Sequence, residues 1–170
     1  MSAPAPGPEV FIALGANLGN SRQAVVDAME LLQALSAAPL RRSSLWQSTP
    51  VDCPPNSPPF INAVVRLMPH PAETPESLLG KLQGLEREFG RNFNPQRNAP
   101  RTLDLDLIAF GSETRNTPGL TLPHPRFGER RFVLAPLSEL APDLILPGQS
   151  HTVAELLAQA PSDPGLQRLE

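Results

Sequence analysis

The pattern of apolar and polar positions along this chain predicts short strands alternating with helices. Residues 10–14 (VFIAL) are a nearly continuous apolar run, which is typical of a well-buried strand. Residues 21–35 then place apolar side chains at helical spacing, and Asn20 or Ser21 can cap the start of that helix. The glycine-containing connection at 15–20 either cradles a phosphate or forms a simple turn, and its spacing favours the turn.

A proline-rich loop separates the next two predicted strands, which lie at 43–48 and 60–67. The loop spans 49–59, and a long loop within a compact domain is often functional. In the second of these strands Phe60 and Asn62 share a face, because side chains alternate along a strand. A buried asparagine needs hydrogen-bond partners, so Asn62 serves either the structure or a ligand.

A second helix is predicted to begin at 74–76, where Thr-Pro-Glu combines an N-cap, a proline at the first position and an early acidic side chain. Four apolar residues at helical spacing form its stripe: Leu78, Leu82, Leu85 and Phe89. Gly90 suits the end of this helix, and we expect the polar residues 91–99 to form a mobile loop.

The next predicted strand, 100–108, carries two carboxylates in an otherwise apolar setting. Three leucines share one face, and Asp104 and Asp106 share the other, with Cα atoms about 6.6 Å apart. An ionised carboxylate is rarely buried without a partner. Protonation, a pair of arginines or bound Mg²⁺ would each neutralise the two side chains. The alternative is that both are solvated and bind nothing.

The pattern is less regular after this strand. The expected elements are a turn at 111–119, an extended segment at 120–125, a helix at 132–140 that Pro136 breaks, a short strand at 144–146 and a helix at 152–159. The order strand, helix, strand, strand, helix, strand over the first part of the chain predicts an α+β fold. We expect a ferredoxin-like sandwich with a mainly antiparallel sheet, helices on one face and a C-terminal extension.

Composition adds bounds on this fold. The chain has 170 residues, of which 40% are hydrophobic and 18% charged, so we expect a globular protein with a core. Residues 1–7 are expected to be a flexible leader, 8–160 a single domain and 161–170 a tail. The single cysteine excludes an internal disulfide and fits a reducing compartment. With neither a signal peptide nor a long apolar run in the sequence, we expect a cytoplasmic protein.

The charge distribution points to a local anion site. A formal net charge of −3 argues against non-specific binding to nucleic acid. Eight of the 14 basic residues nevertheless fall between Arg87 and Arg131, and all eight are arginines. Arginine offers the planar bidentate geometry that suits phosphate.

Four motifs occur in an order that is characteristic of one enzyme family. They are Ile-Ala-Leu-Gly-Ala-Asn-Leu-Gly at 12–19, Ser-Thr-Pro at 48–50, Phe-Ile-Asn-Ala at 60–63, and Pro-Arg-Thr-Leu-Asp-Leu-Asp at 100–106 with Leu-Pro-His at 122–124. Over roughly residues 9–158 the sequence therefore resembles the 6-hydroxymethyl-7,8-dihydropterin pyrophosphokinases of folate biosynthesis.

The resemblance implies transfer of the terminal pyrophosphate of ATP to the hydroxymethyl oxygen of the pterin, with release of AMP. It also implies that Asp104 and Asp106 hold two Mg²⁺ ions around the triphosphate. Such ions fit the chemistry, because the attacked β-phosphorus is surrounded by dense negative charge. The expected partners are ATP and the reduced pterin, without nucleic acid or membrane, and the expected assembly is a monomer.

The resemblance further assigns roles to individual residues. Those implied in catalysis are Arg91, Arg101, Asp104 and Asp106. Those implied in ATP binding are Gln83, Arg97, Arg101, Leu107, Thr121, His124 and Arg130. Those implied in pterin binding are Thr49, Pro50, Asp52, Phe60, Asn62 and Phe132, with the flat ring stacked between the two phenylalanines.

Some residues depart from the family pattern. Asn98 lies in the segment where the family often has tryptophan, Phe93 stands where a basic residue is common, and Pro125 stands where an aromatic can occur. These positions concern loop closure and adenine contacts. We expect the loops 49–59 and 91–99 to close over the ligands, because phosphoryl transfer to an alcohol must exclude water.

The competing hypothesis is a non-catalytic ferredoxin-like module that binds a nucleotide or RNA through its arginines. The chain lacks the aromatic sheet signature of an RNA-recognition domain, and its net charge is unsuited to RNA.

Overall fold

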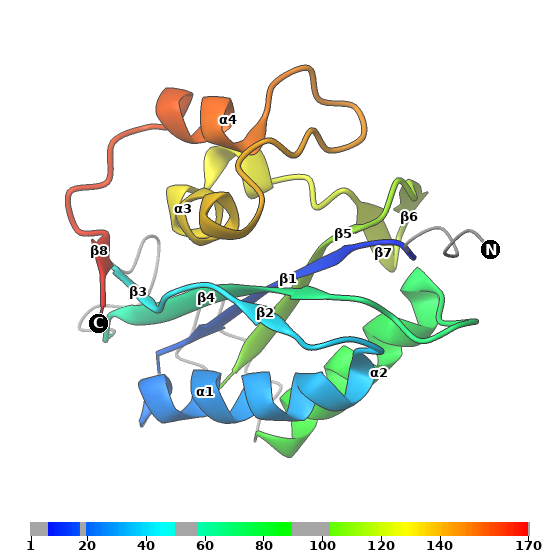
Figure 1. The fold of residues 1–170 in the computed structure, drawn as a ribbon. Coiled ribbons are helices and arrows are strands. Elements are labelled where there is room, and N and C mark those ends of the chain that lie inside the picture. Colours follow the sequence, from blue (N-terminus) through cyan, green and yellow to red (C-terminus); the bar gives the residue numbers. More distant parts are fainter. Residues whose placement is uncertain (1–6, 18–19, 50–57, 90–102, 170) are drawn as a thin grey trace.

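The computed structural model describes residues 7–17, 20–49, 58–89 and 103–169, and an antiparallel sheet runs through its middle (Figure 1). The strands are β1 (Val10–Ala16), β2 (Arg41–Arg42), β3 (Trp46–Ser48), β4 (Phe60–Leu67), β5 (Asp104–Phe110) and β8 (Gln167–Arg168). Their order is β5-β1-β4-β3-β8, and β2 also pairs with β4. Strand β1 lies between β5 and β4 and is antiparallel to both. This is the ferredoxin-like arrangement, so the predicted fold class is confirmed.

Helices α1 (Ser21–Leu32) and α2 (Pro75–Glu88) cover one face of the sheet, below it in Figure 1. Both start as predicted, because the side chain of Asn20 caps α1 and Thr74 forms a capping box at α2. Leu32 is fully buried in the apolar cluster between these helices and the sheet. Each leucine buried in this way stabilises the fold by about 1.5–3 kcal/mol.

Helices α3 (Arg131–Leu140) and α4 (Val153–Gln159) cover the opposite face of the sheet, above it in Figure 1. Leu134 and Leu137 of α3 are fully buried there, in a second apolar cluster that includes Phe11 of β1. The sheet therefore lies between two helical layers, and the C-terminal extension supplies the second layer.

The prediction that Pro136 breaks its helix is wrong, because α3 runs through this residue. A proline inside a helix lacks the N–H that would bond the carbonyl four residues earlier. Here Pro136 is itself buried, and so are its neighbours Ala135 and Leu137. Packing against the sheet on both sides of the proline holds the helix in one piece despite the lost backbone bond.

The short strand predicted at 144–146 is also wrong. These residues form no strand and belong to the connection between α3 and α4. Leu146 is buried in the second apolar cluster, whereas Ile145 beside it is exposed. The apolar residues at 144–146 therefore reflect a connection that buries one side chain, Leu146, in the second apolar cluster, and not a strand.

Other differences concern short elements. The strand expected at 43–48 begins only at Trp46. At Ser43 the side-chain hydroxyl accepts the Val64 N–H at 2.9 Å. This bond replaces the backbone hydrogen bond that a continuous strand would make there. The turn and extended segment expected at 111–125 contain a hairpin, in which Leu122 is buried and Thr121 is exposed. Its strands are β6 (Arg115–Thr117) and β7 (Leu120–Leu122), and the 3₁₀ helices of the structure are η1 (Gln33–Leu35) and η2 (Phe127–Glu129).

The segment expected as a tail adds an edge strand to the sheet. In β8 Gln167 and Arg168 pair with β3, and the Leu169 N–H donates to the carbonyl of Leu45 at 2.8 Å. The predicted domain limits remain a prediction. Across the described ranges, no helix is both long enough and apolar enough to cross a membrane.

Candidate active site

The floor of the candidate site is formed by small residues of β1, which lies between β4 and β5. Gly15 of β1 is aligned with Asn62 of β4 on one side and with Asp104 of β5 on the other. Ala13, two residues earlier, is likewise aligned with Asp106 of β5. A Cβ atom added to Gly15 would lie 3.5 Å from the Asn62 Oδ1 atom. The small residues thus leave a hollow between Asn62 on one side and the two aspartates on the other.

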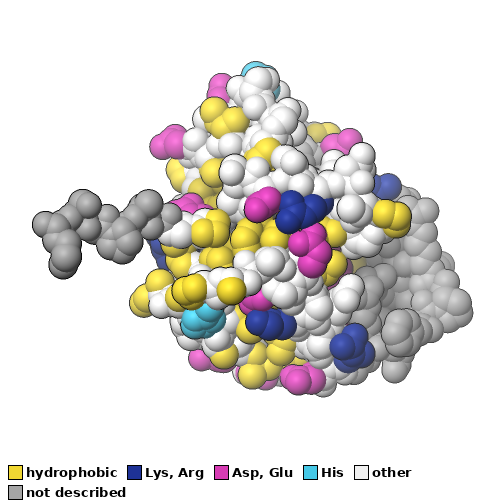
Figure 2. Space-filling view, turned by 90° about the vertical axis from the view of Figure 1, so that its right-hand side faces the viewer, with side chains coloured by type: hydrophobic (Ala, Val, Ile, Leu, Met, Phe, Trp, Pro, Cys, Tyr) yellow, Lys and Arg dark blue, Asp and Glu magenta, His cyan; other side chains and the backbone are white. Residues whose placement is uncertain are grey.

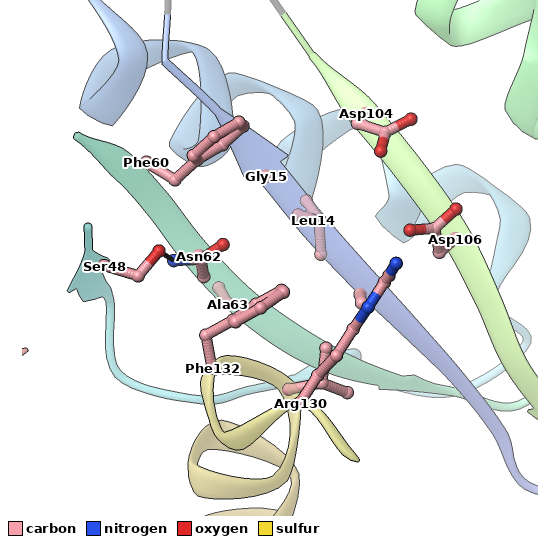
Figure 3. A pocket seen from close by; sticks show the side chains of 12 residues that line it. Leu14, Gly15, Ser48, Phe60, Asn62, Ala63, Asp104, Asp106, Arg130 and Phe132 are labelled. Atoms are coloured by element: carbon pink, nitrogen blue, oxygen red, sulfur yellow. Dashed lines mark hydrogen bonds between the residues drawn. The ribbon is translucent and has the colours of Figure 1, made fainter. Parts of the chain in front are cut away.

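The two aspartates of β5 lie on the wall of this hollow. The alternation predicted for the strand is confirmed, because Leu105 and Leu107 are buried in the cluster under α1 and α2. Asp104 and Asp106 are half-buried on the opposite face and line the cavity. Figure 3 shows both carboxylates on the same side of the strand.

Aromatic side chains form the other end of the same cavity. Phe60 of β4 and Phe132 of α3 both line it, and Figure 3 shows their rings on either side of Asn62. Asn62 is 5% exposed, and its Nδ2 atom donates to the Ser48 Oγ atom at 2.8 Å. This bond leaves the Oδ1 atom on the side of Gly15. Asn62 therefore has a structural partner and also borders the cavity, so both predicted roles fit.

Arg130 places a positive charge between the aromatic and acidic ends. It lines the cavity together with Phe132 and both aspartates, and Figure 3 shows its side chain extending toward Asp106. Its guanidinium carbon lies 5.7 Å from the centroid of the Phe132 ring, which is within reach of a cation–π interaction.

A second pocket adjoins the first at Asp106. It is lined by Asp106 and by three residues predicted to contact ATP: Leu107, Thr121 and His124. Pro125, one of the departures from the family pattern, lines it too. Asp106 also borders a small hollow that Arg130 and His124 share. Asp106 thus stands where the aromatic cavity and the second pocket meet.

The state of the His124 ring follows from its contacts. Its Nδ1 atom accepts the Arg126 N–H at 3.1 Å, so in the neutral ring the proton is carried by Nε2. Burial lowers the pKa of His124, and the positive charges of Arg130 and Arg126 lower it further, against the opposing effect of Asp104. The His124 backbone N–H donates to the Ile108 carbonyl at 2.8 Å, which fixes the residue beside β5.

Two predicted residues lie away from these cavities. Gln83 is exposed on α2 and is not among the described residues that line either cavity. Thr49 is exposed just after β3, with its side chain close to the backbone of Gly165. Their roles in binding remain predictions. The remaining predicted site residues lie outside the described ranges: Pro50, Asp52, Arg91, Arg97 and Arg101. Most of the two loops that were expected to close, 49–59 and 91–99, lies outside these ranges too.

Sequence reasoning did not assign a role to several residues that line the aromatic cavity: Ala13, Leu14, Gly15, Ser48, Ala63 and Val133. Ser48 and Gly15 belong to motifs that were recognised, but their part in the site depends on which strands pair. Pairing between β1, β4 and β5 is set by contacts between distant segments, which one sequence does not reveal.

The donor set at the aspartates fits one kind of metal ion. Among the described residues there is no group of three or more His, Cys, Asp or Glu side chains that could hold a metal ion. Mg²⁺ in nucleotide sites is commonly bound by one or two carboxylates and completes its shell with phosphates and water. Asp104 and Asp106 therefore fit Mg²⁺ that is shared with a nucleotide.

The sequence matches a family model over residues 11–142, and that model describes 7,8-dihydro-6-hydroxymethylpterin-pyrophosphokinase. A 2-amino-4-hydroxy-6-hydroxymethyldihydropteridine pyrophosphokinase of Pseudomonas aeruginosa is 41% identical over 161 residues, which cover 94% of this chain and 96% of that protein. An enzyme of the same name from Haemophilus influenzae is 37% identical over 88% of this chain and 91% of its own length.

The fold is similar to that of solved structures. The wild-type HPPK-DHPS protein of Plasmodium falciparum, crystallised with pteroate, superposes with a TM-score of 0.76 at 12% sequence identity. An HPPK-DHPS structure described as a complex with substrates gives a TM-score of 0.73 at 10% identity. More than 90% of this chain is covered in both, while it spans 47% of each of those longer chains. At this identity the likeness supports the fold.

Proposed function

The chain belongs to the 7,8-dihydro-6-hydroxymethylpterin-pyrophosphokinase family, and on this basis we propose that its two adjoining cavities bind the two substrates of that reaction. The enzyme transfers pyrophosphate from ATP to the hydroxymethyl group of 6-hydroxymethyl-7,8-dihydropterin in folate synthesis. AMP is the second product.

One observation carries the assignment of the site. Asp106 lines both the aromatic cavity and the second pocket, and Asp104 stands beside it on the same face. A reaction between two substrates requires the acceptor oxygen and the attacked phosphorus to meet at one point. The aspartates mark that point, with the pterin on the aromatic side and ATP on the side of His124.

The aromatic cavity suits a flat heterocycle. Phe60 and Phe132 offer two ring faces for stacking, which is favoured by large apolar contact and by ring electrostatics. Asn62 borders the same cavity, and its Oδ1 atom can accept a hydrogen bond from the pterin edge. Apolar and aromatic walls with a few placed polar groups are typical of small-molecule sites.

Charge neutralisation is the second requirement of this reaction. We infer that Asp104 and Asp106 hold two Mg²⁺ ions shared with the triphosphate, whose oxygens and water would complete the coordination shells. Bound Mg²⁺ would neutralise phosphate charge and lower the pKa of the attacking hydroxyl. The chain itself adds the guanidinium of Arg130 and the Nε2–H of His124, which can donate to phosphate oxygens.

The competing nucleotide- or RNA-binding hypothesis receives less support. Acidic and basic side chains are interspersed on the described part of the face shown in Figure 2. Arg115 is paired with Glu76 at 2.7 Å and with Glu113 at 2.9 Å. We propose that ATP and the reduced pterin are the ligands, that nucleic acid is not, and that the enzyme acts as a monomer. A cytoplasmic location remains a prediction.

A coupled assay tests this function. AMP release from ATP is measured with and without the reduced pterin alcohol, and with Mg²⁺ or an excess of chelator. We expect AMP only when the pterin and Mg²⁺ are both present. Binding of ATP without any pterin-dependent release of AMP would favour the non-catalytic alternative instead.

A further inference from the structure

Glu86 is a buried acidic residue to which the proposed reaction assigns no role. It lies near the end of α2 and is 3% exposed. Charged side chains are seldom buried this far unless they are bound to a partner. Its Oε2 atom accepts the backbone N–H of Leu105 at 2.9 Å, in a buried hydrogen bond between segments 19 residues apart in sequence.

The position of the bonded amide makes this contact relevant to the site. Leu105 lies between Asp104 and Asp106 in β5, which is the strand at one edge of the sheet. Alternate N–H groups of an edge strand point away from the sheet and lack a strand partner. For the Leu105 N–H, the carboxylate of Glu86 is the acceptor that a neighbouring strand would otherwise provide.

Glu86 acts from the face of the sheet opposite to the aromatic cavity, where Leu105 and Leu107 also line the second pocket. Glu86 belongs to α2, which packs on the face of β5 that carries Leu105 and Leu107. The two aspartates point to the opposite face. Glu86 is also not among the described residues that line either cavity. It is therefore placed to hold the strand rather than to contact a substrate.

We propose that Glu86 is a positioning residue for Asp104 and Asp106. By fixing the peptide plane between Asp104 and Leu105, it sets the direction in which both carboxylates leave the strand. A charged acceptor makes this bond stronger than a neutral one would. The inference rests on the proposed function, because it concerns the binding of Mg²⁺ and ATP at the two aspartates.

The experiment compares Glu86→Leu, which removes the acceptor at similar volume, with Glu86→Gln, which keeps a neutral acceptor. The control is Leu82→Ala, which removes a fully buried side chain from the same helix without touching the Leu105 amide. Two quantities are measured on each full-length variant without pterin: hydrogen exchange of the Leu105 amide by NMR, and the Kd of ATP at fixed Mg²⁺.

In Glu86→Leu the Leu105 amide should exchange faster than in the wild type, and the Kd for ATP with Mg²⁺ should rise by about tenfold or more, as for the loss of other residues that orient metal ligands. When Mg²⁺ is removed with a chelator, the Kd for ATP should differ much less between Glu86→Leu and the wild type. Glu86→Gln should fall between the wild type and Glu86→Leu on both measures. Leu82→Ala should lower the Tm while leaving the Kd within about twofold of the wild type, because the loss of packing is local.

An unchanged Kd in Glu86→Leu, or an equal rise in Leu82→Ala, would overturn the proposal. Should Glu86→Leu fail to fold, Glu86→Gln decides, and wild-type values of both exchange and Kd in that variant would refute it. Failure of the proposed function is recognised separately, as the absence of pterin-dependent AMP release by the wild type.

Discussion

Asp106 is the residue through which the two halves of the site are connected, since it lines both cavities. We predict that Asp104→Ala and Asp106→Ala each lower kcat by roughly 10²–10³-fold or more, the size of effect seen when one preorganised electrostatic contact is lost. Both side chains are half-buried, so the fold should persist. AMP release and circular dichroism check the two parts of this prediction. Near-normal turnover of both variants at saturating Mg²⁺ would show that the aspartates are solvated strand residues.

His124 links the site to pH. Because burial and nearby arginines lower the pKa of His124 in the folded protein, the unfolded chain takes up this proton first as the pH falls. The contribution of His124 to stability is complete above about pH 6.5, the ordinary value for histidine, and declines as the pH falls from there through the lower pKa of the folded state. We predict that His124→Gln loses less stability than the wild type between pH 7.5 and 5.5, as measured by urea unfolding. Equal losses in the two proteins would contradict the assignment.

Gly15 is predicted to control access to the aromatic cavity. A Cβ atom there would make only ordinary contact with Asn62, at 3.5 Å, so a larger side chain would extend into the hollow. Gly15→Val should therefore raise the KM for the pterin by about tenfold, which corresponds to 1.4 kcal/mol, and leave the affinity for ATP nearly unchanged. Gly80→Val is the matched control, because a Cβ at Gly80 would meet nothing within 4 Å. An equal loss of affinity for the pterin and for ATP would indicate a general disturbance of the sheet.

At the scale of elements, sequence alone predicted those parts whose signals are local. The cap at Thr74 and the alternation around Asp104 and Asp106 depend only on residues close together in the sequence, and both are present as expected. The path of the chain through Pro136 was not predictable in this way, because burial against the sheet outweighs the proline's lost hydrogen bond. The two-residue strands β2 and β8 carry no pattern of their own and exist through their partners.

The segment that follows α4 supports the start of the loop expected to bind pterin. Strand β8 pairs with β3, and a Cβ atom added to Gly165 would lie 1.7 Å from the Oγ1 atom of Thr49. We predict that Gly165→Ala displaces Thr49 and raises the KM for the pterin more than the KM for ATP. Steady-state kinetics, with the concentration of each substrate varied in turn, measure the two KM values. The control is Gly7→Ala, because a Cβ at Gly7 would meet nothing within 4 Å. Unchanged pterin kinetics in Gly165→Ala would show that this contact has no part in binding.

At the scale of the whole molecule, two apolar clusters on opposite faces hold the sheet between helical layers. The C-terminal extension was expected, and the family resemblance assigned its Phe132 to the pterin site, but the second helical layer that it adds to the sheet was not expected. In that layer α3 brings Phe132 over strands far away in sequence. The pairing of β1 with both β4 and β5 then sets Asn62, Gly15 and Asp104 side by side. The family resemblance was enough to nominate Phe132, Asn62 and Asp104 individually. The small floor residues between them became part of the site only through long-range strand register.

The central claim is that the two cavities join ATP and the pterin so that a pyrophosphoryl group moves as one unit. The most direct measurement is phosphorus NMR of the products formed from ATP, Mg²⁺ and the reduced pterin alcohol by the wild-type enzyme. We predict AMP and the pterin diphosphate in equal amounts. ADP with a pterin monophosphate, or AMP with free pyrophosphate and unchanged pterin, would contradict it.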